Sequence, residues 1–465
     1  MHHECRTHGS PGQTVYVTYI IKDPKIKSAA RYEVVCTIFH KLVCVAFVDL
    51  IAITDQGTDK SDQDQSVVIH YIKHSGFSLS KETLLLCGET TVIRPFLEHV
   101  RDTFTHVPCS KPRRFLVFIN PIGGKGNGRK TFDDIVKPLF DLAGITCDVV
   151  VSERQNMCTE VMESQDLTNI DGIIVCGGDG TLSEVTNVLL RRTMVAADLD
   201  FNEPKCKVPT AAIPVGHIPT GTANVMTHCC FGCVDVVSAT LCIIKGNKRP
   251  MGVSGVYSGG KLLRYSMVGV SIGFIADMMN NRDQLRWMGM LRLLWVPIVM
   301  LFTGFRHFIA EITIDTRTKT DVSEGDKITY TEKEEKFEGE IFNTMLLCWS
   351  LKNVKGKSQI WPNRGPFQTF IFYKKGCSSL QFVWHIIKLM SGKQEALQQE
   401  FLQHYQAAGY TIRVKEDNPV DANLEINIDG DPFRLPEPNH ENRFHSDAVL
   451  MFSSLTDTDA DSSVQ

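Results

Sequence analysis

The sequence lacks a long uninterrupted hydrophobic run. Its longest apolar run, from Leu293 to Phe302, contains Pro297 and is about half as long as a bilayer-spanning helix requires. The segment from Met1 to Thr18 is polar and has no apolar stretch of the kind found in secretory signals. We therefore expect a cytoplasmic protein whose contact with intracellular or plasma membranes is peripheral.

The composition also lacks a basic excess and a regular cysteine framework. A net charge of −4 gives no reason to expect a nucleic-acid partner. The 15 cysteines show no regular spacing, which favours a reduced, intracellular protein over a disulfide scaffold. One C-x-x-C pair, Cys230 and Cys233, stands beside Cys229, but without a second pair we expect buried cysteines rather than a zinc site.

A chain of 465 residues is too long for one typical hydrophobic core, so we expect two or three domains. Residues 1–13 are predicted to be a disordered tail. Residues 14–108 contain several β-prone runs and end in an amphipathic helix over 92–104, the layout of a short pleckstrin-homology-like module. The basic loop from Lys22 to Lys27 either contacts acidic phospholipid headgroups or is simply solvated.

Residues 111–248 alternate predicted strands with predicted helices, which indicates a parallel α/β sheet. Polar or glycine-rich turns follow these strands at Asn120, Ser152, Gly177 and Thr220. Open α/β sheets bind ligands at the carboxyl ends of their strands, so these turns are predicted to meet a nucleotide.

Two of these turns are rich in glycine. The first, Asn120-Pro121-Ile122-Gly123-Gly124-Lys125-Gly126, lets the backbone approach phosphate closely, and Lys125 adds a positive charge; its spacing is not that of a Walker A motif. The second, Cys176-Gly177-Gly178-Asp179-Gly180-Thr181, places Asp179 at a helix N-terminus, which attracts anions. An acid there repels phosphate unless it takes a proton or holds a cation. This combination indicates phosphoryl transfer, and a plain helix-cap acid is the alternative.

From residue 249 to 453 the sequence changes to short β-prone runs, which predict an antiparallel second lobe. A helical insert over residues 276–302 interrupts it. The highly charged segment 316–340 is predicted to be a mobile loop, and the Asp/Ser-rich segment 454–465 a disordered tail.

The two glycine turns and Pro219-Thr220-Gly221-Thr222-Ala223-Asn224 occur in the order typical of the diacylglycerol-kinase-type catalytic domain. The resemblance covers about residues 111–452. Within that family, the segments 261–266 and 286–289 are most similar to ceramide kinases and ceramide-kinase-like proteins. The resemblance implies an α/β plus all-β fold with two lobes: a Rossmann-like nucleotide lobe and a lipid-binding antiparallel β-sandwich lobe.

The resemblance also implies roles for single residues. Asp179 corresponds to the acid proposed as general base toward the lipid hydroxyl, and Asp277 to a substrate-binding acid. The cofactors would be ATP and Mg²⁺, with Asp429, Asp431 and Glu184 as candidate metal ligands; Glu184 could equally interact with its own helix dipole. The ATP-binding residues would be Asn120, Gly123, Gly124, Lys125, Gly126, Ser152, Gly177, Gly178, Gly180, Thr181, Gly221, Thr222, Asn224, Arg286, Arg292 and Asp431, with a solvated helix face as the alternative for the two arginines.

The implied acceptor is the primary hydroxyl of ceramide. Met279 stands where sphingosine kinases carry a second acid, which fits an uncharged head group; diacylglycerol and sphingosine remain alternatives. Three departures from the family pattern leave open a catalytically impaired lipid-binding regulator. Two acids of relatives are missing in the segment 365–370, Gly252 replaces a third, and Asp431 replaces a glutamate. An NAD-kinase-like enzyme also shares the G-G-D-G-T turn.

The segment from Phe372 to Leu389 is basic and amphipathic. Calmodulin-binding helices have this character, so Ca²⁺/calmodulin is a candidate partner. A helix packed on the core of the second lobe is the expectation we prefer.

Overall fold

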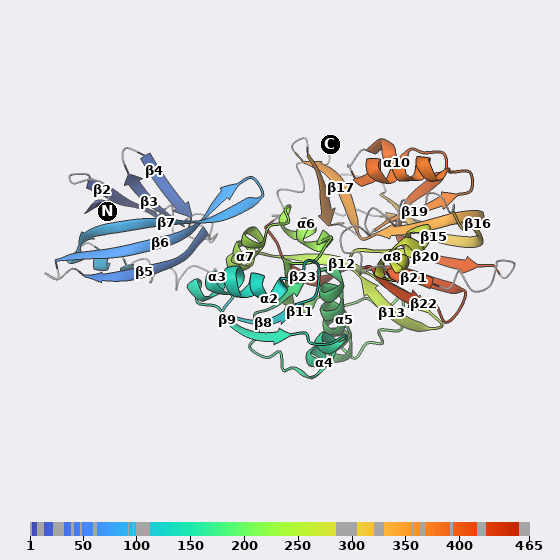
Figure 1. The fold of residues 1–465 in the computed structure, drawn as a ribbon, viewed down its shortest axis with the longest axis horizontal. Helices are drawn as coiled ribbons and strands as arrows, with labels where there is room; N and C mark the ends of the chain where they lie inside the picture. The colour runs from blue at the N-terminus through green and yellow to red at the C-terminus, as the bar shows by residue number, and fades with distance from the viewer. Residues whose placement is uncertain are drawn as a thin grey trace.

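The computed structural model describes residues 2–6, 14–21, 32–38, 41–46, 49–58, 63–91, 93–95, 97–98, 112–284, 305–319, 330–354, 357–362, 368–390, 394–415 and 425–454. Figure 1 shows the N-terminal strands at one end of the molecule, an α/β region beside them, and an antiparallel region with helix α10 (Ser379–Met390) at the far end. The amphipathic helix expected over 92–104 and the helical insert beyond Gln284 lie mainly outside the described residues.

The N-terminal strands form a seven-stranded antiparallel sheet in the order β4-β3-β2-β1-β7-β6-β5. The expectation of a disordered tail is wrong for β1, which pairs with β2 from His2↔Thr18 to Arg6↔Thr14. Its residues are polar and show no apolar alternation, so its sequence does not predict a strand. Backbone hydrogen bonds to the neighbouring strand β2 define it instead. The strands are β1 (His2–Arg6), β2 (Thr14–Ile21), β3 (Tyr32–Ile38), β4 (Lys41–Ala46), β5 (Leu50–Thr58), β6 (Asp64–Ser75) and β7 (Ser78–Glu89).

This sheet packs on helix α7 (Val236–Lys245) of the α/β region. The backbone N–H of Leu79 donates to Ser238 Oγ at 2.8 Å, and Lys245 Nζ pairs with Asp49 at 2.7 Å. Ile51, Ile72 and Leu79 are buried in the same hydrophobic core as the α/β strands. The N-terminal sheet is therefore attached to the α/β region by both apolar and polar contacts.

The predicted parallel sheet is present, in the order β9-β8-β10-β11. Strands β8 (Arg114–Ile119) and β10 (Gly172–Gly177) are almost entirely buried, as expected of strands covered by helices on both faces. The chain runs from β8 outward to β9 (Thr146–Val151) and then returns to the other side of β8, so the strand order reverses between β8 and β10. Ligands bind at such a switch point in open α/β sheets.

The remaining elements of this region surround the switch point. Helix α5 (Asp179–Ala196) follows β10 directly, and β11 (Ala211–Pro219) leads to α6 (Val225–Phe231). The others are α2 (Gly128–Thr131), the π-helix η3 (Phe132–Val136), α3 (Lys137–Leu142) and α4 (Met157–Ser164).

Strand β23 (Asn439–Phe452) joins the parallel and antiparallel parts into one mixed sheet. It pairs in parallel with β11 and antiparallel with β12 and β20. The antiparallel strands are β12 (Lys248–Ser258), β13 (Lys261–Ser266), β14 (Gly269–Gly273), β15 (Phe308–Lys319), β16 (Tyr330–Leu347), β19 (Gln368–Lys374), β20 (Leu402–Val414), β21 (Glu425–Ile428) and β22 (Asp431–Arg434). Separate from it, β17 (Trp349–Val354) and β18 (Lys357–Pro362) form a hairpin.

The prediction of a mobile loop over 316–340 is wrong for most of that segment. Strand β16 pairs with β15 from Phe308↔Ile341 to Lys319↔Tyr330. Charged residues along β16 obscured the strand pattern, but Phe337 faces inward and packs against Phe372 with 4.6 Å between ring centroids. The ion pair of Glu340 with Lys375, at 2.8 Å, lies on the exposed edge of this strand.

Two helices lie on the antiparallel part, α8 (Phe274–Gln284) and α10, followed by the short 3-10 helix η5 (Gln394–Leu397). None of the single helices among the described residues has the length and apolar character needed to cross a membrane. The bent pair α6–α7 meets that test by length and composition only.

Candidate active site

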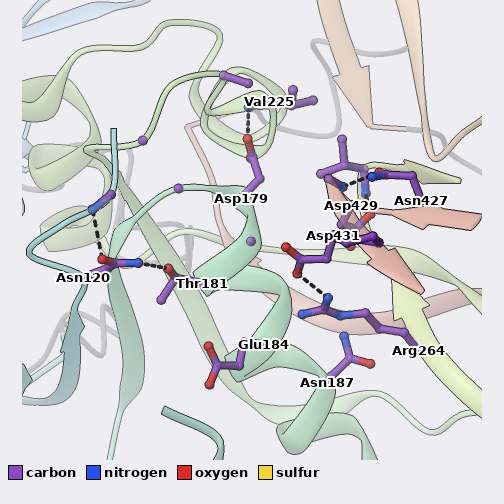
Figure 2. A pocket seen from close by; sticks show the side chains of 18 of the residues that line it. Asn120, Asp179, Thr181, Glu184, Asn187, Val225, Arg264, Asn427, Asp429 and Asp431 are labelled. Carbon is purple, nitrogen blue, oxygen red and sulfur yellow. Dashed lines mark hydrogen bonds and ion pairs between the residues drawn. The ribbon is translucent and has the colours of Figure 1, made fainter. Parts of the chain in front are cut away.

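A cavity of about 1730 Å³ opens at the carboxyl ends of the parallel strands. Its walls include the predicted turns after β8, β9, β10 and β11, together with residues from β13, β14, β16 and the β21–β22 turn. Figure 2 shows Asn120, Asp179, Thr181 and Asp431 around one part of this space. The sequence-predicted turns are therefore brought together in one place.

Three of the glycine turns are in direct backbone contact. A Cβ atom on Gly124, which has a φ of +58°, would lie 2.3 Å from the carbonyl oxygen of Thr220. A Cβ atom on Gly221 would lie 2.3 Å from the Cα of Gly178. Neither backbone can yield to a methyl group, so these positions require glycine. The three turns therefore pack closely against one another through their backbones.

Asn120 fixes the first turn to the second. Its Nδ2 donates to Thr181 Oγ1 at 2.9 Å, and its Oδ1 accepts from the N–H of Gly123 at 3.0 Å (Figure 2). Asn120 thus positions the two turns, and it lines the cavity together with Gly123, Gly124 and Lys125.

The Asp179 side chain faces helix α6. Its Oδ2 accepts from the N–H of Val225 at 3.1 Å (Figure 2), and its Oδ1 accepts from the N–H of Met226 at 3.0 Å. These donors hold the carboxylate in one orientation at the cavity wall. A carboxylate offers about four lone-pair sites, so two accepted bonds leave capacity for a further proton or donor.

A buried histidine forms a hydrogen bond to the same turn. His217 in β11 has its Nε2 at 3.1 Å from the carbonyl oxygen of Gly177 and its Nδ1 at 2.9 Å from Thr227 Oγ1. Burial lowers the pKa of His217, and the charge of Asp179 opposes that shift. In the neutral ring, an N–H at Nε2 donates to Gly177 and the Thr227 hydroxyl donates to Nδ1, which holds the G-G-D-G turn in place.

The three predicted metal ligands are not gathered into one cluster. Glu184 Oε1 accepts from both the N–H and the hydroxyl of Thr159, at 3.0 Å each, and so ties α5 to α4. No group of three or more His, Cys, Asp or Glu side chains suited to a metal ion occurs in the described part of the chain. Cys229 and Cys230 are buried, and that burial raises the pKa of both thiols.

Asp429 is saturated by donors. Its two oxygens accept from the hydroxyls of Ser183 and Ser266 at 2.7 and 2.6 Å. They also accept from the backbone N–H groups of Met267, Val268 and Gly269 at 2.9–3.0 Å. A carboxylate with five donors is a structural junction between α5, the β13–β14 turn and the β21–β22 turn, which corrects its prediction as a metal ligand.

Asp431 fits the predicted metal role better. Its Oδ2 pairs with Arg264 Nη1 at 2.6 Å, and its side chain is 46 % exposed (Figure 2). A Cβ atom on Gly180 would lie 4.0 Å from both Asp431 oxygens, so the acid stands beside the N-terminal turn of α5. Mg²⁺ at nucleotide sites usually takes one or two carboxylates and completes its shell with phosphate oxygens and water. One accessible carboxylate beside an anion-binding helix N-terminus meets that requirement.

The other predicted residues are distributed as follows. Ser152, Gly178, Gly180, Thr181, Gly221 and Thr222 line the cavity with Asp179. Asn224 is buried and accepts from the N–H of Gly221 at 3.0 Å, so it shapes the turn from behind. Asp277 pairs with Arg306 at 2.9 Å, and burial raises its pKa against that pairing. The lining residues of the cavity do not include Gly126, Gly177 or Asp277, and Arg286 and Arg292 lie outside the described residues.

The far end of the cavity is apolar. Ile275 and Met279 of α8, Met345 and Leu347 of β16, and Trp349 of β17 line it. The cavity therefore extends from backbone N–H groups and charged side chains to a wall suited to hydrocarbon.

Three lining residues were missed from the sequence: Arg264, Arg191 and Asn187. Arg264 stacks over Phe433 at 5.5 Å besides pairing with Asp431. Asn187 donates from Nδ2 to the carbonyl oxygen of Tyr265 and accepts from its N–H, at 2.8 and 2.7 Å. A polar residue on the buried face of α5 was the available signal for Asn187; the pairing of Arg264 depends on strands far apart in the chain.

Comparisons with known proteins agree with this geometry. Residues 114–256 match the diacylglycerol kinase catalytic domain. The chain is 32 % identical to human ceramide kinase over 253 residues, which is 54 % of this chain and 46 % of that protein. It is 36 % identical to mouse ceramide kinase over 201 residues, 43 % of this chain and 36 % of that protein. The chain thus spans less than half the length of these relatives.

A solved structure of a candidate diacylglycerol kinase from Bacillus anthracis str. Sterne shares the fold. Its TM-score is 0.51 at 18 % sequence identity, covering 74 % of this chain and 96 % of that one. The three glycine turns and the acid between them lie within residues 114–256, which match the diacylglycerol kinase catalytic domain, and the chain is similar to ceramide kinases over about half of its length.

Proposed function

We propose that this protein is a lipid kinase that transfers the γ-phosphate of ATP to the primary hydroxyl of ceramide. The observation that carries the proposal is one cavity whose lining combines the glycine turns, Asp179 and the apolar side chains of Ile275, Met279 and Trp349. A nucleotide and a hydrocarbon-bearing alcohol would each find matching chemistry among these lining residues.

Asp179 is proposed as the general base. The alcohol has a high pKa, so its proton moves to the carboxylate only as the new oxygen–phosphorus bond forms. The N–H groups of Val225 and Met226 favour the ionised form of Asp179 and fix its direction. The Asp179 carboxylate is therefore already oriented when it accepts the proton.

The phosphates are proposed to lie on the N–H groups at the start of α5 and on the first glycine turn. Helix N-termini and glycine-rich turns attract anions, and Lys125 adds a positive charge. We also assign ATP contacts to Arg286 and Arg292, on the family resemblance alone. Mg²⁺, when bound with ATP, offsets the phosphate charge; of the predicted ligands, Asp431 is the one whose position suits it.

Ceramide is preferred over a free sphingoid base because Met279 lines the cavity where sphingosine kinases are expected to carry an acid. A charged amine would lack a partner at that position, whereas an amide-linked acyl chain would not need one. The relatives of this chain include ceramide kinases and sphingosine kinases. Diacylglycerol also has a primary hydroxyl, so it is an alternative acceptor.

We further propose that the chain has three parts: a nucleotide-binding lobe at 111–248, a lipid-binding lobe of β-sandwich type at 249–453, and a pleckstrin-homology-like module at 14–108. Six of the seven antiparallel strands of the N-terminal sheet, β2 to β7, lie within that module and support the last assignment. The module would bring the enzyme to acidic phospholipid on the cytoplasmic face of a membrane.

A catalytically impaired lipid-binding regulator is the second candidate, and one contact favours it. Gly252 occupies the position of an acid in relatives, and a Cβ atom there would lie 2.3 Å from the Phe444 ring. The space for an acidic side chain is thus filled by Phe444. Thr369, in the segment where two further acids are missing, is buried in β19 and accepts from Gln406 Nε2 at 3.2 Å.

The deciding experiment is transfer of radiolabelled γ-phosphate from ATP to ceramide, sphingosine, diacylglycerol and NAD, tested side by side. We expect labelled ceramide, and a loss of roughly 10²–10⁴-fold in Asp179→Asn. Asp198→Asn is the matched control, because Asp198 is an exposed acid just beyond the same helix. Ceramide binding without transfer to any acceptor would favour the regulator, and labelled NAD would replace the lipid-kinase proposal.

A further inference from the structure

The outer face of helix α10 carries a stripe of exposed apolar side chains. Leu380, Trp384 and Ile387 are 75, 60 and 50 % exposed, and their spacing of four and three residues places them on one side of the helix. This outer stripe, defined by those three residues, is unusual because large apolar side chains gathered on one surface generally mark an interaction site.

The opposite face of α10 is fixed in the core. The ring of Phe382 lies 5.0 Å from Tyr373, 5.4 Å from Phe342 and 5.3 Å from Phe274, each in an edge-to-face arrangement. His385 also contacts Tyr373 through a hydrogen bond of 3.0 Å. The preferred expectation of a core-packed helix is confirmed, but that packing does not account for the outer stripe.

The stretch of sequence that contains α10 carries basic residues and no acids. Residues 341–394 contain no Asp or Glu and eight Lys or Arg, in a chain whose net charge is −4. Lys388 lies on α10 itself, one residue after Ile387; Lys374 and Lys375 precede the helix, and Lys375 is paired with Glu340 at 2.8 Å. An apolar stripe within a segment free of acids complements a surface that is apolar inside and anionic outside.

The helix is also close to the apolar end of the cavity. Phe274, which Phe382 contacts, begins α8, and the next residue and Met279 of that helix line the cavity. Figure 1 shows α10 above strands β19 and β16, on the side remote from the N-terminal sheet. A surface that met the outer stripe would lie one helix layer away from the proposed acceptor site.

We propose that α10 docks on an anionic lipid membrane, with the outer stripe inserted at the headgroup level and Lys388 beside it paired with acidic lipids. Trp is favoured at membrane interfaces, and amphipathic helices bind there in proportion to their buried apolar area and to their attraction for anionic lipid. The proposal concerns binding rather than catalysis and is measurable without turnover.

A membrane suits this helix better than calmodulin does. Calmodulin accepts an amphipathic helix in a hydrophobic groove, which requires access to the main apolar face. In α10 that face holds Phe382 and Leu389, both buried. A flat bilayer needs only the stripe that is already exposed.

The test is partition of the full-length chain onto vesicles of phosphatidylcholine with and without phosphatidylserine. For Leu380→Ser/Trp384→Ser we expect at least about a tenfold loss of partition. Val195→Ser, at a side chain 64 % exposed on α5, is the control and should bind like the wild type. Lys388→Gln should lose about fivefold on the anionic vesicles only.

A direct measurement accompanies the variants. Vesicles with brominated acyl chains should quench part of the wild-type tryptophan fluorescence, and Trp384→Phe should lose that part while still binding. Equal quenching of both proteins, or a double variant that binds as well as Val195→Ser, would refute the proposal. The proposal would also be refuted if the double variant lost Ca²⁺-calmodulin binding but still bound vesicles as well as the wild type.

The outcome is separable from that of the proposed reaction. A lipid kinase with this docking surface should phosphorylate a water-soluble short-chain ceramide at the wild-type rate in the double variant, and vesicle-embedded ceramide more slowly. Vesicle binding that depends on the stripe in a protein without kinase activity would support this inference and remove the proposed function.

Discussion

The hydroxyl of Ser183 donates a hydrogen bond of 2.7 Å to the carboxylate of Asp429, across a sequence separation of 246 residues. Through this bond the helix that begins with Asp179 is held against the turn that carries Asp431. Helix α5 and the β21–β22 turn are therefore held together by a buried carboxylate two residues before the candidate metal ligand.

Asp429→Asn should destabilise the protein by roughly 2–4 kcal/mol, since an amide cannot accept from five donors and turns one of its own donors toward them. Asn tolerates the left-handed backbone at this position, φ +55°, so the change isolates the hydrogen bonds. The free energy of unfolding in urea is the measurement.

Asp447→Asn is the control for that experiment. Asp447 has a φ of +56° and an exposed side chain, so the same chemical change meets the same backbone without the buried donors. Equal stability of the two variants would contradict the role assigned to Asp429.

The sequence predicted the α/β strands, the glycine turns and Asp179, because these depend on local patterns: apolar runs, glycine spacing and one acid between them. It could not predict the junction at Asp429, whose donors come from residues more than 150 positions away. For the same reason the Arg264–Asp431 pair was missed. Strand β1 and the charged strand β16 were missed because their partners, rather than their own patterns, define them.

Two glycines of the site should respond to alanine in opposite ways. Gly221→Ala places a methyl group 2.3 Å from the Cα of Gly178 and should lower the melting temperature, with a cost of at least about 1–3 kcal/mol. Gly180→Ala lies within helix α5, with only the Asp431 carboxylate, 4.0 Å away, near the new methyl. It should stabilise the helix by roughly 0.5–1 kcal/mol.

Gly180→Ala should nevertheless weaken ATP binding, because its methyl group occupies the space between the helix N-terminus and Asp431. Melting temperatures and ATP titrations of both variants would separate the two effects. If Gly180→Ala gains stability and binds ATP with the wild-type affinity, the phosphates do not lie between this helix N-terminus and Asp431.

Asp431→Asn should raise the Mg²⁺ concentration needed for half-maximal phosphate transfer by about tenfold or more, because a neutral amide is a poorer ligand for a hard cation. Asp431→Glu restores the residue expected in relatives and should retain activity. Glu437→Gln, at an exposed acid a few residues on, is the control. An unchanged Mg²⁺ requirement in Asp431→Asn would remove this residue from the metal site.

The stability of the protein should fall in mild acid, and His440 is a principal cause. Burial lowers the pKa of His440 from 6.5 to about 4, and within the described residues neither ring nitrogen has a hydrogen-bond partner. The unfolded chain takes up this proton below pH 6.5, whereas the folded protein does so only below about pH 4. The stability present above pH 6.5 is thus lost as the pH falls toward 4, by about 1.4 kcal/mol per pH unit for this one residue.

His440→Leu removes the titrating group while keeping an apolar side chain against the Tyr410 ring, whose centroid lies 5.6 Å away. We expect a flatter dependence of the unfolding free energy on pH between 7 and 5, and a difference from the wild type that grows as the pH falls. His404→Gln, an exposed histidine on the neighbouring strand β20, should follow the wild-type curve. His445, whose pKa burial also lowers to about 4, keeps part of the slope in every variant. Parallel curves for His440→Leu and the wild type would show that His440 protonates as readily folded as unfolded.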